Sequence, residues 1–376
     1  MEGCLIPWGV RKRETLKLYL YILRRLGITV LVLLGVSLVV FILERAISPP
    51  SDALFGQVQL GMTYQQQLSL AQQDGVATMS CPSFQAFSAS QPGCLIPWYE
   101  QYLPWLKEFF SYDVGNIFSI YSSAGGVTAE LLIVSSGVLA LFGLVTGILA
   151  ASHHNSIFDN VSRLVTYVLF SIPIFVTALF LKTVLSYDIY VGSKPLLQTY
   201  GQLATSCALC IANPGTITAF TGLPLVDSLA SHNLAFFWDT LLALILPALT
   251  LGLAYSPYIF KLSRSSMLQA LSDSYILFAR SKGLTERIVV YRHALKNAAL
   301  PTITITAWVV SSMLGGVTVV DLVFNLNGIG SVILGASLNF DAQTIADILV
   351  SFALIVVLVN LISDVLYAAF DPRIRY

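Results

Sequence analysis

The run ARSKGLTERIVVYRHALKNAALP, residues 279–301, concentrates basic side chains in a part of the chain that is otherwise apolar. Long apolar segments lie on both sides of it, near 238–260 and 300–322. A basic connection between two apolar segments of this length is typical of a loop between membrane helices. The stretch therefore predicts a charged loop that joins two membrane-spanning helices.

The composition of the whole chain also indicates a membrane protein. Of the 376 residues, 56% are hydrophobic and 11% are charged, whereas about a quarter of the residues in a soluble domain are charged. A helix of about 20 apolar residues crosses a bilayer and satisfies its own backbone hydrogen bonds there. Segments of this kind lie near 24–43, 128–151, 163–186, 238–260, 300–322 and 344–367. We therefore predict an all-α membrane protein with six transmembrane helices.

The positions of Lys and Arg predict the orientation in the membrane. Every even-numbered connection and both termini are basic, whereas the odd-numbered connections hold few basic residues. Because cytoplasmic loops carry the excess of Lys and Arg, both termini are predicted to be cytoplasmic. The basic residues on that side are Arg11, Lys12, Arg13, Lys17, Arg24, Arg25, Arg163, Lys261, Arg264, Arg280, Lys282, Arg287, Arg292, Lys296, Arg373 and Arg375.

The predicted organisation follows from these spans. The first apolar stretch is longer than the roughly 7–15 residues of a signal peptide, so we expect it to remain as a membrane helix; cleavage near Ala46–Ser48 is the alternative. A sizeable external insertion separates the first two spans. The predicted segments are a cytoplasmic N-terminal segment 1–23, the first span 24–44, an external region 45–126, a core 127–370 that includes an external loop 187–237 and a cytoplasmic loop 263–299, and a cytoplasmic tail 371–376.

Cysteines occur in both predicted external regions, where disulfides are permitted. Cys207 and Cys210 can form a small disulfide, contribute half of a metal site or be two unrelated thiols. A Cys81–Cys94 disulfide is equally compatible with this topology. Because no second cysteine pair or histidine cluster adjoins Cys207, a zinc site is disfavoured, and no metal is expected.

The cytoplasmic loop carries the signals of two helices that meet at a glycine. Ser272 or Asp273 can cap the first helix. Gly283 is predicted to end it in the left-handed conformation, with Leu284 folding back onto the helix. The spacing of apolar residues predicts a stripe along one face. That stripe consists of Leu271, Tyr275, Phe278 and Ala279.

The second helix of the loop is predicted to begin after Thr285, with Glu286 in its first turn. Its predicted stripe is Ile288, Tyr291, Leu295 and Ala298, and Pro301 is predicted to start the next span. The positive-inside rule and contact with anionic lipids both explain the charge of the loop. Neither explains the helix–Gly–helix layout, which a docking surface for a cytoplasmic partner does explain.

Several segments resemble one family. The run DSYILFARSKGLTERIVVYRHALKNAALP is similar to the cytoplasmic loop of permease subunits in ABC importers of the dipeptide/oligopeptide class. The general importer motif begins Glu-Ala-Ala six residues before its Gly; here Leu277, Phe278 and Ala279 stand in those places, a departure common in the peptide class. Similar segments elsewhere are YILRRLGITVLVLLGVSLVVFIL, WLKEFFSYDVGNIF, FWDTLLALILPALTLGLA, GGVTVVDLVFNLNGIG and NLISDVLYAAFDPRIR. The resemblance covers most of 19–45, 99–185 and 222–376.

The resemblance implies a type I ABC importer permease fold in the cell membrane. It also implies a heterodimer with a second homologous permease subunit, two cytoplasmic ABC ATPase subunits and an external solute-binding protein, in contact with membrane lipids and not with nucleic acid. In the family, the loop holds the coupling helix that fits the ATPase. The matching residues here are Tyr275, Phe278, Ala279, Arg280, Lys282, Gly283 and Leu284.

Motifs for chemistry are absent from the sequence. It contains no P-loop, no H-E-x-x-H and no G-x-S-x-G. We therefore expect a transport subunit and not an enzyme, with ATP and Mg²⁺ bound by separate ATPase subunits. Hydroxyls in a membrane helix usually bond backbone or a neighbouring helix. Lining of the translocation pathway by Thr306, Ser311 and Ser312 is the alternative.

The resemblance implies short peptides as the transported solute. Oligosaccharides are an alternative, because the external loops are neutral and rich in Ser, Thr, Gln and Tyr. A passive channel or an ion-driven transporter is less favoured, because the sequence has no inverted-repeat pattern and no paired broken helices. An intramembrane enzyme is disfavoured by the lack of clustered His, Cys or paired carboxylates in the spans.

Overall fold

The structure is a computed structural model that describes residues 8–47, 65–66, 68–69, 96–111, 113–188, 190–191, 194–195, 221–339 and 341–370. Apart from one two-residue ladder, in which β1 (Tyr190–Val191) pairs antiparallel with β2 (Lys194–Pro195), its regular elements are helices. The predicted all-α class is confirmed with this small exception in the 187–237 loop. Most of the predicted external region lies outside the described residues, as do Cys81, Cys94, Cys207 and Cys210.

Among the described residues, five helices are long and apolar enough to cross a membrane. They agree with predicted spans one, two, four, five and six to within several residues, except that the fourth runs on past 260. They are Arg24–Glu44 within α1 (Trp8–Ile47), Gly126–Ser152 across α7 (Gly126–Leu139), η2 (Ala140–Val145) and α8 (Thr146–Ser152), Leu234–Ser272 as α14, Pro301–Phe324 within α17 (Leu295–Phe324), and Ala342–Ser363 within α19 (Ala342–Phe370).

The third predicted span, 163–186, is not one straight helix. It is divided into α9 (Ile157–Ser171) and α10 (Ile174–Lys182), which meet at an angle of 104°, and η3 (Thr183–Asp188) continues α10. Pro173 has no backbone N–H and disfavours a helical conformation in the residue before it. Ile172 is accordingly extended, with φ −92° and ψ 124°. The pair is long and apolar enough to form one broken span, so the segment was predicted correctly but its shape was not.

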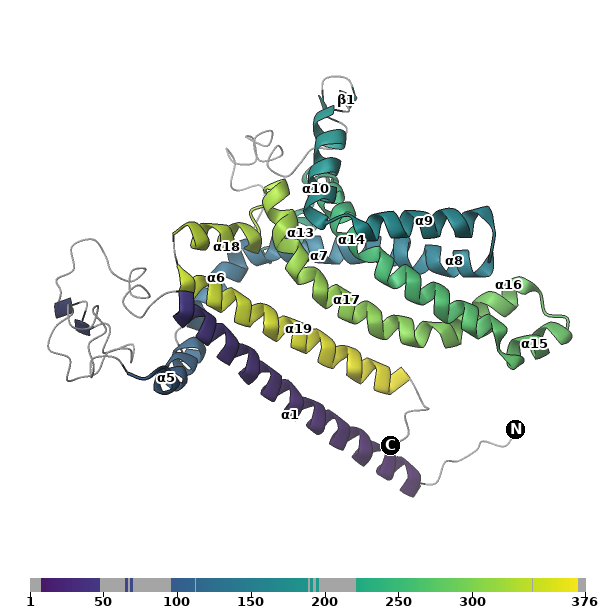
Figure 1. Ribbon diagram of the computed structural model, residues 1–376, viewed down its shortest axis with the longest axis horizontal. Helices are drawn as coiled ribbons and strands as arrows, with labels where there is room; N and C mark the ends of the chain where they lie inside the picture. The colour runs from purple at the N-terminus through teal and green to yellow at the C-terminus, as the bar shows by residue number, and fades with distance from the viewer. Residues whose placement is uncertain are drawn as a thin grey trace.

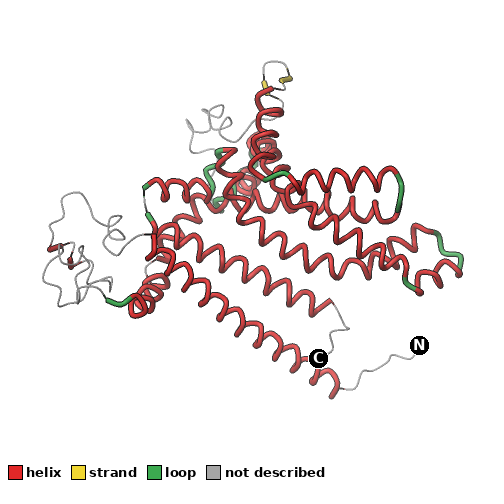
Figure 2. The backbone as a smooth tube through the Cα atoms, in the orientation of Figure 1, coloured by secondary structure: helices red, strands yellow, loops and turns green. Residues whose placement is uncertain are grey.

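The helices are arranged around α14. The main core gathers side chains of α7, α14 and α17, including the fully buried Leu131, Leu251 and Met313. Figure 1 shows α1 beside α19 at the edge of this bundle. The start of α1, the end of α19, the α8–α9 turn and the segment that follows α14 all lie toward one end. Figure 2 shows that the described frame is almost entirely helix with short loops.

The predicted aromatic stretch 99–118 is helical, as α5 (Trp98–Ser111) and α6 (Asp113–Ile120), and η1 (Tyr121–Gly125) leads into α7. Its aromatic residues pack against the first span. The ring centroids of Phe41 and Trp105 are 5.5 Å apart, and the Trp105 Nε1 donates to the carboxylate of Glu44 at 3.1 Å. Burial of these rings fixes α5 against the end of α1.

A short apolar helix between the last two spans, α18 (Ile329–Leu338), was not predicted. Its first N–H groups are satisfied from other elements. Asp321 of α17 accepts from Gly328 N at 3.0 Å and from Ser331 N at 2.8 Å, and Thr128 of α7 accepts from Ile329 N at 3.0 Å. Free N–H groups at a helix start need such partners when they are buried. Hydrogen bonds therefore attach the start of α18 to α17 and α7.

Asp321→Ala is expected to lower the free energy of unfolding by about 2 kcal/mol, because the buried Gly328 N–H loses its acceptor. The Ser331 N–H is partly buried and keeps its bond to Gly328 O at 3.2 Å. The matched control is Asp341→Ala. Asp341 caps α19 in the same way, through Thr344 N at 3.0 Å, but it is half-buried, so we expect a loss of about 1 kcal/mol. Thermal unfolding in detergent measures the two losses, and hydrogen exchange at residues 328–331 locates the first. Equal losses in the two variants would contradict the prediction.

Candidate functional site

The loop between α14 and α17 continues the helical bundle and does not hang free from it. α14 runs to Ser272, twelve residues beyond the predicted span end at 260, and α15 (Ser274–Ser281) follows after one extended residue, Asp273. The predicted cap position at Asp273 is confirmed by its φ of −71° and ψ of 150°, although its side chain makes no capping hydrogen bond. The loop therefore begins from a rigid helix end.

The turn at Gly283 has the predicted left-handed conformation. Gly283 has φ +76°, its N–H donates to Arg280 O at 2.9 Å, and Leu284 N donates to Ala279 O at 3.4 Å. These two bonds form the Schellman motif, which satisfies the last carbonyls of α15. Leu284 packs against the apolar cluster that contains Ala279. The backbone at this turn is thus fixed by local hydrogen bonds and by one apolar contact.

The predicted stripe of α15 is wrong in one residue. Ile276 is fully buried and Ala279 is 6% exposed, but Phe278 is 62% exposed and Leu277 is 59% exposed. Ile276 and Ala279 pack on Met267 and the other residues of the cluster beneath the loop. The part of α15 that is free to meet a partner is therefore the Leu277–Phe278 face.

The second half of the loop differs more from the prediction. α16 (Glu286–Ile288), the π-helical η4 (Val289–Ala294) and α17 form one continuous helix, so Pro301 lies inside a helix and does not start one. Ile288 and Tyr291 of the predicted stripe are exposed. A π-turn closes i→i+5 hydrogen bonds and shifts the faces of a helix relative to the 3.6-residue period. The buried residues are Val289, Val290, Ala294 and Ala298.

Polar contacts hold the outer side of the Gly283 turn. The guanidinium of Arg280 donates to both carboxylate oxygens of Glu286, at 2.7 and 3.2 Å. The Lys282 Nζ lies 4.6 Å from the ring centroid of Phe278. The hydroxyl of Tyr275 is buried without a hydrogen-bond partner among the described residues. The Arg280–Glu286 ion pair bridges the helices on either side of Gly283.

Glu286→Gln tests this ion pair. The hydrogen bonds from Arg280 hold the pKa of Glu286 below its ordinary value. The charged carboxylate therefore stabilises the folded loop above the ordinary glutamate pKa, and that contribution is lost as the pH falls through the lowered folded-state pKa. Because both side chains are exposed, we expect Glu286→Gln to cost less than about 1 kcal/mol and to remove this acid dependence. Chemical denaturation at neutral and acid pH measures both, and an unchanged pH dependence would contradict the prediction.

The α8–α9 turn beside the loop is held by a buried ion pair that sequence reasoning missed. Asp159 is fully buried, and its two oxygens accept from Arg264 of α14 at 2.7 and 2.8 Å. It also accepts from Asn155 N at 3.1 Å, while Ser156 caps α9 through Asp159 N at 3.2 Å. Ser156-x-x-Asp159 matches the capping-box pattern, a signal that marks the start of α9. The capping-box pattern does not predict that Asp159 binds Arg264, which is 105 residues away.

A cavity of ≈ 720 Å³ lies where this turn meets the loop. Its lining combines the end of α8 with the outer side of α16 and η4. The lining residues are Ser152, His153, Glu286, Arg287, Val290 and Tyr291. The loop thus presents an apolar face on α15 and, beside α16, a hollow lined by both polar and apolar side chains.

The hydroxyls of α17 named as pathway candidates bond to their own helix. Thr306, Ser311 and Ser312 each donate to the carbonyl four residues earlier, at 2.7, 3.0 and 2.9 Å. Ser311 is buried, and Thr306 and Ser312 are partly exposed. Ser312 lies four residues after the exposed Trp308, on the same side of the helix. The three candidates therefore do not form one surface.

A family model described as the binding-protein-dependent transport system inner membrane component matches residues 143–376. The match contains the buried ion pair, the whole loop and the last two spans. The chain belongs to this family. As an inner membrane component of a transport system, it is a multi-pass membrane protein, which agrees with its apolar helices.

Curated relatives of this inner membrane component extend along nearly its whole length. The di/tripeptide transport system permease protein DppB of Pseudomonas aeruginosa (strain UCBPP-PA14) is 29% identical over 95% of this chain and 98% of its own. The dipeptide transport system permease protein DppB of Escherichia coli (strain K12) is 28% identical over 95% of this chain and 98% of its own. The oligopeptide transport system permease protein AppB of Bacillus subtilis (strain 168) is 29% identical over 95% of this chain and 99% of its own.

Proposed function

We propose that this chain is a permease subunit of an ATP-driven, binding-protein-dependent ABC importer and forms half of the translocation pathway for short peptides. Its family membership supports the importer, and relatives named as dipeptide, tripeptide and oligopeptide permeases support the solute. Peptides are therefore preferred to oligosaccharides. A channel or an ion-driven transporter has no such support.

The observation that carries the proposal is the construction of the loop. Ile276 and Ala279 anchor α15 on the ends of α8 and α14, while Leu277 and Phe278 on the other face are more than half exposed. An exposed apolar pair beside Lys282 is a docking surface for a cytoplasmic protein. Movement of an attached ATPase would pass through α15 directly to α14 and through η4 to α17.

The proposed complex contains this chain, a second homologous permease, two cytoplasmic ABC ATPases that bind ATP and Mg²⁺, and an external solute-binding protein. We place both termini and the loop 263–299 in the cytoplasm, because the basic residues gather at those connections. The coupling residues of this proposal are Tyr275, Phe278, Ala279, Arg280, Lys282, Gly283 and Leu284. Tyr275 and Ala279 act from the buried side, as anchors of α15, and Phe278 acts from the exposed side.

The test is purification of the tagged chain in gentle detergent from its native membrane, followed by sequencing of every co-purifying chain. We expect P-loop ATPases, a sister permease and a solute-binding protein. The purified complex is then reconstituted, and ATP-driven uptake of a labelled tripeptide is compared with that of a labelled trisaccharide. A chain that reproducibly purifies alone contradicts the importer, and uptake of the trisaccharide alone contradicts the peptide assignment.

A further inference from the structure

An aromatic cluster on the outside of the bundle has no part in the coupling loop or the apolar core. Phe170 of α9, Tyr258 of α14 and Trp308 of α17 come from three different spans. The ring of Tyr258 lies 5.4 Å from that of Phe170 and 6.4 Å from that of Trp308, edge-on to both. All three rings are about half exposed, at 58%, 42% and 53%. Within residues 243–260 of α14, all of which the structure describes, Tyr258 is the one exposed residue.

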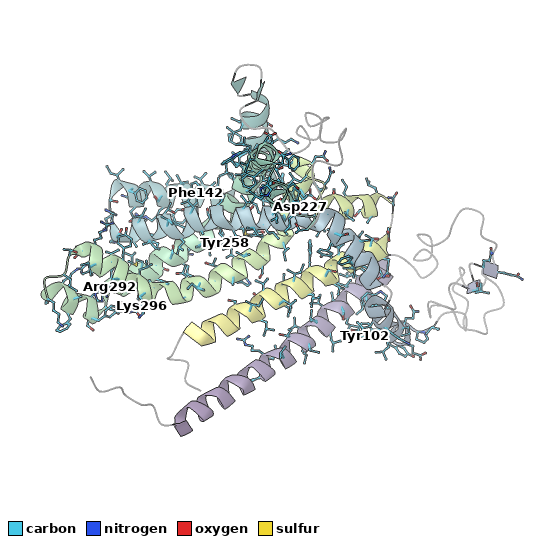
Figure 3. All side chains as sticks on the ribbon, turned by 180° about the vertical axis from the view of Figure 1, so that it is seen from behind. Tyr102, Phe142, Asp227, Tyr258, Arg292 and Lys296 are labelled. Atoms are coloured by element: carbon cyan, nitrogen blue, oxygen red, sulfur yellow. The ribbon has the colours of Figure 1, made fainter. Side chains whose placement is uncertain are left out.

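The cluster lies in the cytoplasmic half of the span region, with Trp308 well away from the charged loop. Tyr258 precedes Lys261 by three residues, about 4.5 Å along a helix, and Arg264 by six, about 9 Å, whereas Trp308 follows Lys296 by twelve, about 18 Å. Figure 3 shows Tyr258 nearer the middle of the bundle than Arg292 and Lys296. Tyr and Trp in contact with lipid concentrate at the level of the head groups. Trp308 is farther from the charged end than a head-group position predicts, whereas Tyr258 lies within one turn of Lys261.

The backbone beside the cluster gives an independent reason to exclude lipid. The break between α9 and α10 directly follows Phe170, and Ser171, Ile172 and Pro173 are all exposed. Irregular backbone at membrane depth is tolerated only where protein covers it or where it lines a water-filled cavity. The Tyr258 hydroxyl also makes no hydrogen bond within the described part of the chain. A lone polar group of this kind requires water or a solute beside it.

The large size of the exposed side chains favours a translocation pathway over a permanent interface between subunits. Helices that pack closely in membranes do so through small residues, which let the backbones approach. Here the exposed surface is formed by three large rings, which keep a neighbouring helix at a distance. Tyr255 joins α14 to α17 beside the cluster, because its hydroxyl donates to Ser312 O at 3.0 Å. Pro257 precedes Tyr258 inside the continuous helix α14, and Pro173, at the break between α9 and α10, follows Phe170 by three residues.

We propose that Phe170, Tyr258 and Trp308 line the translocation pathway on its cytoplasmic side and contact the solute as it passes. The inference rests on the proposed function and adds to it the residues that form the wall of the pathway. Rings and one hydroxyl bind the uncharged parts of a peptide, its backbone amides and apolar side chains, and offer no ionic partner for its termini. This wall therefore admits peptides of different charge.

The experiment uses the reconstituted complex, in which the five native cysteines of this chain are replaced by serine and peptide uptake is retained. Tyr258→Cys and Trp308→Cys are exposed to a charged, membrane-impermeant thiol reagent, with and without saturating labelled tripeptide. Phe142→Cys is the matched control, because Phe142 of η2 is 40% exposed and lies outside the cluster. We expect both cluster cysteines to react and the peptide to slow their reaction about tenfold, because a bound solute covers most of its contact surface. The control is expected to be insensitive to peptide.

Uptake by Tyr258→Ala provides a second readout. We expect its kcat/KM to fall about threefold to tenfold, the ratio for the loss of one aromatic contact. Tyr258→Phe keeps the ring and loses only the hydroxyl, so we expect a smaller fall than for Tyr258→Ala. Cluster cysteines that do not react, or that cross-link to the sister permease, would overturn the inference in favour of lipid or a subunit interface. Reaction without protection by peptide would overturn it as well. If the unsubstituted complex takes up no peptide, the proposed function fails first, and the inference fails with it.

Discussion

Gly283→Val is expected to lower ATP-driven uptake by at least about tenfold while the chain still inserts and assembles. Gly283 has φ +76°, a conformation that costs an L-residue about 1–2 kcal/mol and is least accessible to β-branched residues. An added Cβ would meet no atom within 4 Å, so the effect comes from the backbone and not from a clash. The turn would relax and displace Phe278 and Lys282 from the docking surface. Because each 1.4 kcal/mol is about tenfold in an equilibrium, we expect uptake to fall by at least about tenfold.

The variants at this position form a graded series. Gly283→Asn is the matched control, because Asn tolerates the left-handed region, and we expect it to retain most of the uptake. Gly283→Pro is expected to be the most severe, because proline fixes φ near −65° and removes the N–H that bonds to Arg280 O. Uptake and peptide-stimulated ATP hydrolysis in proteoliposomes measure coupling, and the yield of assembled complex measures insertion. Normal uptake by Val and Pro would remove Gly283 from the mechanism.

Asp159→Ala is expected to lower the free energy of unfolding by about 3–5 kcal/mol, the cost of leaving one member of a buried ion pair alone. The side chain of Arg264 is only 16% exposed, and that of Asp159 is fully buried. The variant would also remove the acceptor of Asn155 N, so that the α8–α9 turn loses its attachment to α14. Denaturant unfolding of the purified chain in detergent measures the loss.

Two further variants isolate the pair. Arg163→Ala is the control, because the side chain of Arg163 is 37% exposed and its Nε lies 3.8 Å from the same carboxylate, so we expect a loss below about 1 kcal/mol. The double variant Asp159→Ala with Arg264→Met removes both members of the buried pair, and we expect it to be more stable than Asp159→Ala alone. A loss for Asp159→Ala no larger than that for Arg163→Ala would show that the pair does not hold the turn.

Some of this fold was predictable because its causes are local. Apolar length alone sets the number and position of the spans, since a bilayer requires about 20 helical residues. The end of α15 at Gly283 was predictable too, because only glycine adopts the left-handed conformation at little cost. Pro173 is also a local signal, but it marks only where a helix breaks. The 104° angle between α9 and α10 depends on the packing of α10 against α14 and α17.

The stripes of the loop show where local reasoning fails. The 3.6-residue period placed Phe278, Ile288 and Tyr291 in the interior, and all three are exposed. In the second helix, the π-turns of η4 change the spacing of the buried residues, and no sequence signal in residues 289–294 predicts these turns. In α15, the neighbouring helices decide which face is buried, because Ile276 meets the ends of α8 and α14.

The sequence by itself determined the class of the protein, its spans, the glycine turn of its loop and its family resemblance. Those properties depend on residues near one another along the chain. Only the tertiary structure brought Asp159 to Arg264, Asp321 to the start of α18, and Phe170, Tyr258 and Trp308 into one cluster. Each of these contacts joins elements that are separate in sequence, and its energy depends on burial and on distances of a few ångströms. Helix packing sets these quantities, and no spacing along the chain encodes them.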